Sequence, residues 1–281
     1  MRVDPRSGHL AVAASNCIDR TLWPSVKLRP GEGFAGRVLQ EGRPLLVTDA
    51  RGPRPYETAS FAIAPVVSLG DGASPAIAGV LSVTDKRSRA SFTPEDLERL
   101  AILAAQAGTA LDNARLFERT TLDPLTRAWT RQYFDCRMED LVAGLSDGRE
   151  PLTVILVDVD HLKDKNDVYG RRAGDAILSE GAELIQFKLH RAADLVARFA
   201  GEKFAVALPG AGAAEARALA EDIRRTIEEH PFNVEDEPIR ATVSIGGACL
   251  RPGEAPGALL LRAEEALAGA KRAGRNRVEL K

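Results

Sequence analysis

The apolar and polar positions divide the chain into two parts of different character. Between residues 10 and 92, short apolar runs alternate with glycine and proline, which predicts short strands and loops. The runs cover residues 10–14, 44–47, 64–67 and 78–83. From residue 123 onward, helix-like and strand-like segments follow one another, and this order predicts an α/β domain.

A long helix is predicted between the two parts. Thr93 can cap its start, Pro94 suits the first helical position, and Asp96 stands three residues after the cap. Apolar residues then recur at steps of three and four: Leu97, Leu100, Ala104, Ala107, Leu111, Ala114 and Phe117. A helix over about 93–119 would be about 35 to 40 Å long, which is enough to leave one domain and enter the next.

We interpret this helix as a connector, with an ordinary surface helix of the first part as the alternative. Helices of this kind commonly pair with their copy in a dimer, so we expect a homodimer formed through the first part and the helix. The predicted domains are residues 1–118, which include most of the connector, and residues 120–281. Within the second domain, strands are predicted at 152–157, 195–199, 204–208 and 239–246, and helices at 131–145, 174–187, 213–229 and 258–273.

Length, charge and cysteine content narrow the protein class. A chain of 281 residues is the size of two ordinary domains. Its 38 basic and 40 acidic residues nearly balance, which argues against a broad nucleic-acid surface. The N-terminus lacks the apolar core of a signal peptide and no apolar run is long enough for a membrane span, so we expect a cytoplasmic protein with no membrane partner. The three cysteines, Cys17, Cys136 and Cys249, are expected to be reduced core thiols.

The first part resembles GAF domains, a family of small sensor domains. The similar segments are GEGFAGRV at 31–38, PLLVTD at 44–49, GVLSV at 79–83 and FTPEDL at 92–97, and the resemblance covers residues 8–118. GAF domains bind cyclic nucleotides, tetrapyrroles or small metabolites, or only dimerise, and no residue set here identifies a ligand. They usually begin with a helix, whereas here the first expected strand comes almost at once, as expected of a sensor that is truncated or completed by a partner.

The second part resembles GGDEF domains, the catalytic domains of diguanylate cyclases, over residues 121–281. The similar residues are DVDHLK at 158–163, Asn166-Asp167, Gly170, Gly174-Asp175, and the closing AK at 270–271 and GRNRV at 274–278. AGEKF at 200–204 stands in the place of the motif that names the family, in a degenerate form. The resemblance implies a bacterial signalling protein of α/β (α+β) class: a GAF sensor, a connector helix and a palm-like nucleotidyl-cyclase domain.

The resemblance also implies a nucleotide site. Joining two GTP molecules into cyclic di-GMP requires an activated 3′-hydroxyl and an electrophilic α-phosphate, and two divalent ions held by carboxylates supply both. Asp158 and the Val159 carbonyl would hold Mg²⁺ (or Mn²⁺), with Glu202 as the partner across the site. The implied nucleotide-binding residues are Asn166 and Asp175 at the guanine edge, Lys163, Lys271 and Arg275 at the phosphates, and Gly201 at the close backbone approach.

The individual aspartates have simpler explanations. Asp158 taken alone is an ordinary aspartate after a strand, and it is the register of the other motif residues that favours a functional site. Asp160 and Asp167 are explained equally well as solvated or capping carboxylates.

Several positions depart from the family pattern. Lys203 replaces the fourth-position glutamate, which reverses the charge by two units close to the metals and costs about a kcal/mol or more per ion. Ala200 replaces the first glycine, Arg171 a histidine and Leu162 a phenylalanine. The segment DPLTRAWTR at 123–131 keeps DxLT and the last arginine but has Arg127, Ala128 and Thr130 in place of Gly, Leu and Asn.

A second site is kept. Arg191 and Asp194 form an RxxD motif five residues before Ala200, and at this spacing the family binds cyclic di-GMP as an inhibitor. Arginine offers a planar fork to phosphate or guanine, and aspartate accepts from guanine nitrogens. Arg198 could assist from the adjoining strand, while a solvated turn with an ion pair is the alternative.

Three functions remain open from the sequence. The first is a catalytically impaired GGDEF protein that binds GTP or cyclic di-GMP and passes on a signal, and Lys203 favours it. The second is a working diguanylate cyclase, which the retained Asp158, Glu202 and Lys271 favour. The third is a structural dimerisation module without nucleotide, which the same retained residues disfavour.

Overall fold

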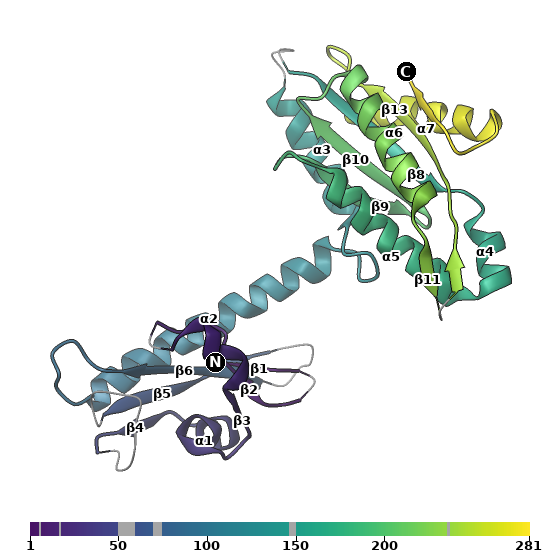
Figure 1. The fold of residues 1–281 in the computed structure, drawn as a ribbon. Helices are drawn as coiled ribbons and strands as arrows, with labels where there is room; N and C mark the ends of the chain where they lie inside the picture. The colour runs from purple at the N-terminus through teal and green to yellow at the C-terminus, as the bar shows by residue number, and fades with distance from the viewer. Residues whose placement is uncertain (6, 17, 50–59, 70–74, 146–149, 235–236) are drawn as a thin grey trace. The chain divides into compact units, whose positions relative to one another are not determined.

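The computed structural model describes residues 1–281 except 6, 17, 50–59, 70–74, 146–149 and 235–236. It divides into two compact units, Met1–Phe117 and Glu118–Lys281 (Figure 1). Cys17 lies outside the described residues.

The first unit is a six-stranded sheet with a helix on each face. The strand order is β3-β2-β1-β6-β5-β4, and all neighbouring strands are antiparallel. The strands are β1 (Arg2–Val3), β2 (Leu10–Ala11), β3 (Lys27–Leu28), β4 (Leu45–Val47), β5 (Phe61–Ser68) and β6 (Ala76–Thr84). The helices are η1 (Arg20–Ser25), α1 (Gly33–Glu41) and α2 (Pro94–Thr121).

The alternation along β5 separates two cores in this unit. Phe61 and Ile63 pack with Val38 of α1 on one face, whereas Ala62 and Ala64 pack with α2 on the other. Helix α1 contradicts the prediction of strands and loops alone between residues 10 and 92. Its apolar positions follow a helical period, but glycines interrupt the segment and obscure that period.

Helix α2 is held firmly against the end of β5. Thr93 and Asp96 form a reciprocal capping box at its start, as the sequence predicts. A side chain at Gly108 would collide with the Val67 carbonyl, so the helix and strand backbones are in close contact there. One turn later, the Asp112 carboxylate accepts hydrogen bonds from Ser68 Oγ at 2.5 Å and from the Leu69 amide at 2.9 Å.

The second unit is a six-stranded sheet covered by helices on both faces (Figure 1). Its strand order is β14-β13-β8-β10-β9-β7, antiparallel except for the outer pairs β13–β14 and β7–β9. The strands are β7 (Trp129–Thr130), β8 (Leu152–Val159), β9 (Leu195–Ala200), β10 (Lys203–Pro209), β13 (Val243–Cys249) and β14 (Val278–Leu280), with a separate hairpin of β11 (Phe232–Val234) and β12 (Glu237–Ile239). The helices are α3 (Arg131–Gly144), α4 (Leu162–Tyr169), α5 (Arg171–Lys188), α6 (Ala213–Glu229) and α7 (Pro256–Arg272).

The central strand β8 is buried along its whole length. Ile155 and Val157 pack in the core beneath α5 and α6, whereas Val154 and Leu156 pack in the core with α3 and α7. By the same alternation, Asp158 lies on the face of α7. The combination of helices and sheets in both units confirms the predicted α/β (α+β) fold class.

Some details of the sequence prediction are wrong. Helix α4 was not predicted, because most of its positions are polar. The single strand expected at 239–246 is two strands, β12 and β13. Cys136 is exposed rather than a core thiol, and Cys249 is half-buried.

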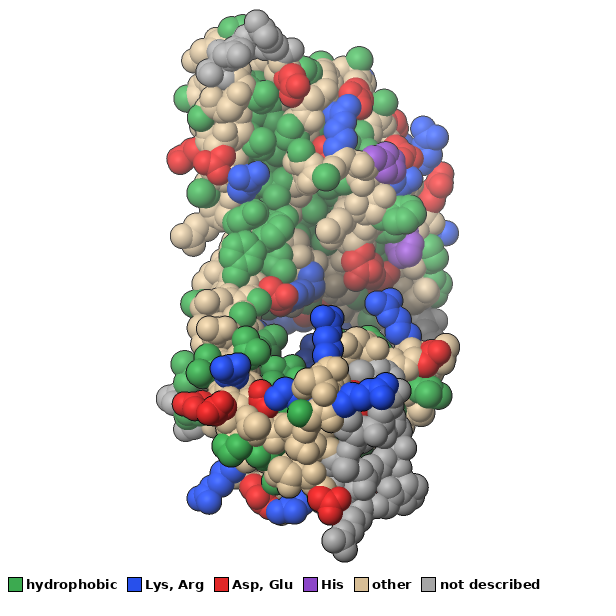
Figure 2. Space-filling view, turned by 90° about the vertical axis from the view of Figure 1, so that its left-hand side faces the viewer, with side chains coloured by type: hydrophobic (Ala, Val, Ile, Leu, Met, Phe, Trp, Pro, Cys, Tyr) green, Lys and Arg blue, Asp and Glu red, His purple; other side chains and the backbone are tan. Residues whose placement is uncertain are grey.

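Among the described residues, none of the helices combines the length and the apolar character needed to cross a lipid bilayer. Figure 2 shows acidic and basic side chains interspersed over the face that it views.

Candidate functional site

The carboxylate of Asp158 is the centre of the candidate site. Asp158 lies at the end of β8 and is only 3% exposed. The ammonium of Lys271, in the last turn of α7, lies 2.6 Å from Asp158 Oδ1. This ion pair joins two of the motifs recognised in the sequence, although 113 positions separate the two residues in the chain. A buried carboxylate needs such a partner, because an unpaired charge in the interior is strongly destabilised.

Glu202 approaches Asp158 from the turn between β9 and β10. The Glu202 carbonyl accepts a hydrogen bond from the Val159 amide at 3.2 Å, which fixes the turn against the end of β8. Gly201, beside it, has φ of 35°, a left-handed conformation that favours glycine. Burial raises the pKa of Glu202, and the neighbouring charge of Asp158 raises it further, while Lys271 and Lys203 act in the opposite direction. The two carboxylates are therefore close enough to repel one another.

Lys203 lies directly opposite Asp158. The two residues are register partners on the adjacent strands β10 and β8, so their side chains share the α7 face of the sheet. Lys203 Nζ lies 3.9 Å from Glu264 Oε1 of α7. The departure noted in the sequence thus puts a second ammonium group beside the Asp158 and Glu202 carboxylates.

The donor set fits a magnesium ion only in part. Two carboxylates and the Val159 carbonyl are the hard oxygen ligands that Mg²⁺ prefers. Within the described parts of the chain, however, no three acidic, histidine or cysteine side chains are grouped closely enough to hold a metal alone. Nucleotide phosphates would have to complete the coordination, as they commonly do for Mg²⁺.

Asp160 is a structural carboxylate, which corrects its reading as a solvated or capping residue. It is 3% exposed and accepts hydrogen bonds from Ser244 Oγ at 2.7 Å and Thr242 Oγ1 at 2.9 Å. The backbone amide of Asn276 donates a third hydrogen bond at 3.1 Å. Asp160 thus fastens the end of β8 to β13 and to the segment after α7. Asp167, by contrast, is exposed on α4.

The proposed guanine-binding residues lie on two helices that pack together. Asn166 is on α4 and Asp175 is on α5. A Cβ at Gly174 would collide with Asn166 Oδ1, so Asn166 lies against the turn of α5 that carries Asp175. Asn166 Oδ1 is buried and accepts no hydrogen bond, which leaves it able to accept one from a ligand. Lys163, one turn before Asn166, is exposed.

Arg275 stands in an unusual turn after α7. Gly274, Arg275 and Asn276 have φ values of 114°, 62° and 45°, three consecutive left-handed residues. The Arg275 amide donates to the Ala270 carbonyl at 3.0 Å, which folds the turn back onto the helix end that carries Lys271. Arg275 itself is exposed.

The RxxD residues border a pocket between the end of α5 and the start of α6. Its volume is about 210 Å³, and its lining includes Arg191, Asp194, Lys188, His190 and Glu215 above an apolar floor. Asp194 Oδ2 accepts from the Arg191 amide at 3.1 Å, while Asp194 Oδ1 is buried and accepts no hydrogen bond. Arg191 Nη2 donates to Glu215 Oε1 at 2.6 Å. An anion that binds Arg191 must therefore either displace Glu215 from the guanidinium or share the guanidinium with it.

Arg198 has other partners than the RxxD residues. Its guanidinium donates to both oxygens of Asp123, at 3.1 and 3.3 Å, and to the Gly201 carbonyl at 3.0 Å. Burial alone would raise the pKa of Asp123, but hydrogen bonds from Thr126 and Arg198 outweigh burial and lower it. Arg198 therefore links the start of the second unit to the turn that carries Glu202.

In the segment 123–131, the structure shows the surroundings of the three residues that depart from the family pattern, Arg127, Ala128 and Thr130. Arg127 has φ of 56°, a conformation that costs most residues other than glycine about 1 kcal/mol or more. Ala128 is buried, and Thr130 caps α3 by accepting from the Tyr133 amide at 3.5 Å. Thr130 thus replaces one capping side chain by another, while Arg127 replaces glycine at a position whose backbone conformation favours glycine.

Sequence reasoning missed Glu264 and Glu215 as partners of the site residues. Glu264 stands seven residues before Lys271, two turns away on the same face of α7, and this spacing could have indicated it. Nothing in the sequence near Arg191 points to Glu215, because the contact joins segments 24 positions apart.

Both parts of the chain are similar to known protein families. The family model described as "Diguanylate cyclase, GGDEF domain" matches residues 120–277, and the GAF domain model matches residues 7–111. The chain is 35% identical over 225 residues to Diguanylate cyclase A of Treponema denticola, a match that covers 78% of this chain and 60% of that protein. It is 34% identical over 212 residues to Diguanylate cyclase DgcP of Pseudomonas aeruginosa, covering 72% of this chain and 31% of that protein.

The second unit is also similar to solved structures. The coiled coil and GGDEF domain of DgcB from Caulobacter crescentus, solved in complex with c-di-GMP, matches with a TM-score of 0.61 and 29% identity. The match covers 66% of this chain and 98% of that one. The chain spans less than two thirds of the length of the two curated relatives named above.

Proposed function

Because this chain belongs to the GGDEF-domain family of diguanylate cyclases and carries a GAF domain, we propose that it is a cyclic di-GMP signalling protein with impaired catalysis. In this proposal, the GGDEF domain binds GTP at the end of β8 and cyclic di-GMP beside the α5–α6 pocket, under control of the GAF domain. The proposed site of action is the cytoplasm, where GTP is available.

The pairing of Lys203 with Asp158 carries the proposal of impairment. Asp158, Glu202, Lys203 and Lys271 together carry no net charge, whereas a glutamate at position 203 would leave two negative charges. Each divalent ion then meets an extra ammonium group at roughly 4–6 Å, which costs on the order of 1 kcal/mol or more even when well screened. We therefore expect incomplete metal occupancy and slow turnover.

The remaining residues support nucleotide binding. Asp158, Glu202 and the Val159 carbonyl would hold Mg²⁺ (or Mn²⁺) together with phosphate oxygens, and the metal would supply the activation of hydroxyl and phosphate. Asn166 and Asp175 would hydrogen-bond the guanine edge, and the buried, unsatisfied Asn166 Oδ1 supports this role. The remaining proposed contacts to the phosphates are Lys163, Lys271, Arg275 and the backbone at Gly201.

The pocket beside Arg191 supports a second nucleotide site. Arg191 offers a planar guanidinium to a phosphate, and the free acceptor Asp194 Oδ1 can take a guanine N–H. Because Glu215 already binds Arg191, we expect the affinity for cyclic di-GMP to be lower than it would be for an unpaired arginine.

The connector supports a homodimer. Ile102, Leu103, Leu116 and Phe117 on α2 are each more than half exposed. The members of the two pairs Ile102–Leu116 and Leu103–Phe117 are fourteen residues apart, two heptads, so each pair lies on one face of the helix. A second copy of α2 would cover these four apolar side chains and bring two GGDEF domains together in one dimer.

An active diguanylate cyclase is the second candidate. The contact between Lys203 and Glu264 favours it, because a nearby carboxylate offsets part of the added positive charge. On this alternative, the protein converts two GTP into cyclic di-GMP and diphosphate, and the Arg191 site serves as feedback inhibition.

Calorimetric titration of nucleotide-free protein tests the proposal. The probes are 3′-deoxy-GTP, which lacks the hydroxyl needed for condensation, and cyclic di-GMP, each in the presence of Mg²⁺. We expect both to bind. If folded protein binds neither 3′-deoxy-GTP nor cyclic di-GMP, the proposal is contradicted and a purely structural module is supported.

A further inference from the structure

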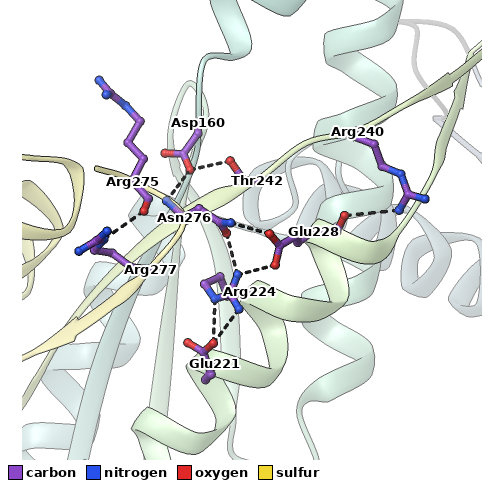
Figure 3. A network of polar contacts seen from close by, with 9 residues as sticks. All are labelled: Asp160, Glu221, Arg224, Glu228, Arg240, Thr242, Arg275, Asn276 and Arg277. Atoms are coloured by element: carbon purple, nitrogen blue, oxygen red, sulfur yellow. Dashed lines mark hydrogen bonds and ion pairs between the residues drawn. The ribbon is translucent and has the colours of Figure 1, made fainter. Parts of the chain in front are cut away.

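A network of polar side chains from α6 and from the end of β8 holds the turn that carries Arg275. Figure 3 shows the network running from Glu221 and Arg224 on α6, through Asn276, to Asp160 after β8. The resemblance to GGDEF domains implies a role for Arg275 at the phosphates but none for Asn276, Arg224 or Glu228.

The side-chain amide of Asn276 is bound at both ends. Its oxygen accepts from Arg224 Nη1 at 2.8 Å, and its nitrogen donates to Glu228 Oε1 at 2.7 Å. Arg224 Nη1 also donates to Glu228 Oε2 at 2.7 Å, which closes a three-membered clamp. The hydrogen bonds from Arg224 and Asn276 lower the pKa of Glu228, so its carboxylate is charged and a strong acceptor at neutral pH.

The clamp is itself held on both sides. Glu221 Oε1 accepts from Arg224 Nε and Nη2 at 2.9 and 2.7 Å, which fixes the plane of the guanidinium. Arg240 donates to the carbonyls of Glu228 and Glu229 at the end of α6. The backbone N–H of Asn276 donates to Asp160 Oδ2, two residues beyond Asp158. Asn276 is thus the joint between α6 and the end of β8.

The turn needs this support because of its backbone. Arg275 and Asn276 both have positive φ, which costs roughly 1–2 kcal/mol for an ordinary residue, although asparagine tolerates it better than most. A turn in this conformation persists only where the surroundings hold it. Figure 3 shows that the side chain of Arg275 extends away from the clamp, on the opposite side of the backbone from Arg224.

We infer that Asn276, clamped by Arg224 and Glu228, is a positioning residue that orients Arg275 toward the phosphates of the bound nucleotide. This inference rests on the proposed function, since it requires that GTP binds at the end of β8. Asn276 acts through Arg275 and does not touch the nucleotide itself. Its loss should therefore weaken binding of phosphates and leave recognition of the guanine unchanged.

The hydrogen-bond pattern of the clamp offers a matched pair of variants. In Asn276→Asp, two carboxylates would face each other where the Asn276 amide now donates to Glu228. Adding Glu228→Gln restores a donor and an acceptor at that contact and keeps the total charge of the wild type. Aspartate also tolerates positive φ, so the backbone penalty is small in both variants.

The test compares dissociation constants for 3′-deoxy-GTP and for guanosine, the latter measured by competition, at fixed Mg²⁺. Asn276→Asp should weaken 3′-deoxy-GTP about tenfold and change guanosine less than twofold, and the double variant with Glu228→Gln should return to within about twofold of the wild type. Arg275→Ala should cause a similar loss, and adding Asn276→Asp to it should cause no more, because the two residues act as one unit.

Two results would overturn the inference alone. One is a result in which the wild type binds 3′-deoxy-GTP and Asn276→Asp has the same dissociation constant. The other is an equal loss for 3′-deoxy-GTP and guanosine, or an added loss on top of Arg275→Ala, either of which indicates a general structural role. A wild type that binds neither probe would instead contradict the proposed function, and the inference would fall with it.

Discussion

Lys203 and Asp158 are direct neighbours across the β10–β8 pair, on the face of the sheet that α7 covers. Asp158 is paired with Lys271 of α7, and Lys203 lies near Glu264 of the same helix, so two ammonium groups lie close to one buried carboxylate. The four charges of Asp158, Glu202, Lys203 and Lys271 sum to zero, so the candidate site is locally neutral. The first prediction follows from this change of charge.

Replacing Lys203 by glutamate should raise the rate of cyclic di-GMP formation, by about tenfold or more, because it removes a repulsion of roughly 1 kcal/mol or more per ion and adds an oxygen ligand. Lys203→Gln is the matched control, since it removes the charge without adding a carboxylate. Its rate of cyclic di-GMP formation should lie between those of the wild type and Lys203→Glu. Product is measured by liquid chromatography. If folded, dimeric Lys203→Glu protein forms no product, Lys203 is not the main defect.

Removing Arg191 should weaken cyclic di-GMP binding. Arg191→Ala removes a charged donor at the α5–α6 pocket, and the expected loss is about tenfold or more in titration calorimetry. Arg198→Ala is the control, because it removes the same charge from a residue that binds Asp123 instead. The second-site proposal fails if Arg191→Ala leaves the affinity unchanged, and an equal loss in Arg198→Ala would assign Arg198 to the site.

Glu202→Gln should stabilise the metal-free protein at neutral pH. The pKa of Glu202 is raised above its ordinary value of 4.5, so the charged form is disfavoured in the folded state and costs stability once the pH exceeds that value. The variant should therefore melt higher than wild type at pH 7.5 in a chelating buffer, and the difference should vanish near pH 4, where Glu202 is protonated. A variant that melts lower at pH 7.5 would show that the Glu202 charge is stabilising.

Arg127→Gly should stabilise the fold by about 0.5–1 kcal/mol, or a rise of a few degrees in Tm, because it relieves a left-handed backbone. The exposed ion pair that Arg127 makes with Glu118 contributes little, so its loss should not offset this gain. Arg127→Ala removes the same ion pair but keeps a Cβ at positive φ, and it should give no gain. Equal stabilisation by both variants would mean that the backbone is not the cause.

Much of the second unit could be predicted because its strands are continuous apolar runs. Strand β8 is recognisable from residues 152–157 alone, and the position of Asp158 at its end follows from that strand. Helix α4 was not predicted, because most of its positions are polar, such as Lys163 and Asp167. These polar residues obscure the repeat of apolar positions from which a helix is predicted.

The candidate site was predicted as a set of residues but not as a set of contacts. Asp158, Glu202 and Lys271 come together as their motifs imply. Asn276 and Asp160 are 116 positions apart, and no local pattern indicates that the backbone of one binds the carboxylate of the other. Arg198 was expected to assist Arg191 from the adjoining strand, and its contact with Asp123, 75 positions away, had no local signal in the sequence.

The central claim is that this GGDEF domain binds nucleotides while Lys203 impairs catalysis. The most direct measurement incubates the nucleotide-free wild type with GTP and Mg²⁺ or Mn²⁺ and resolves the products by liquid chromatography, with Lys203→Glu alongside as the repaired form. The account predicts little or no cyclic di-GMP from the wild type, under conditions where it binds 3′-deoxy-GTP, and clear product from the variant. Rapid formation of cyclic di-GMP by the wild type would contradict the account and identify an active cyclase that tolerates Lys203.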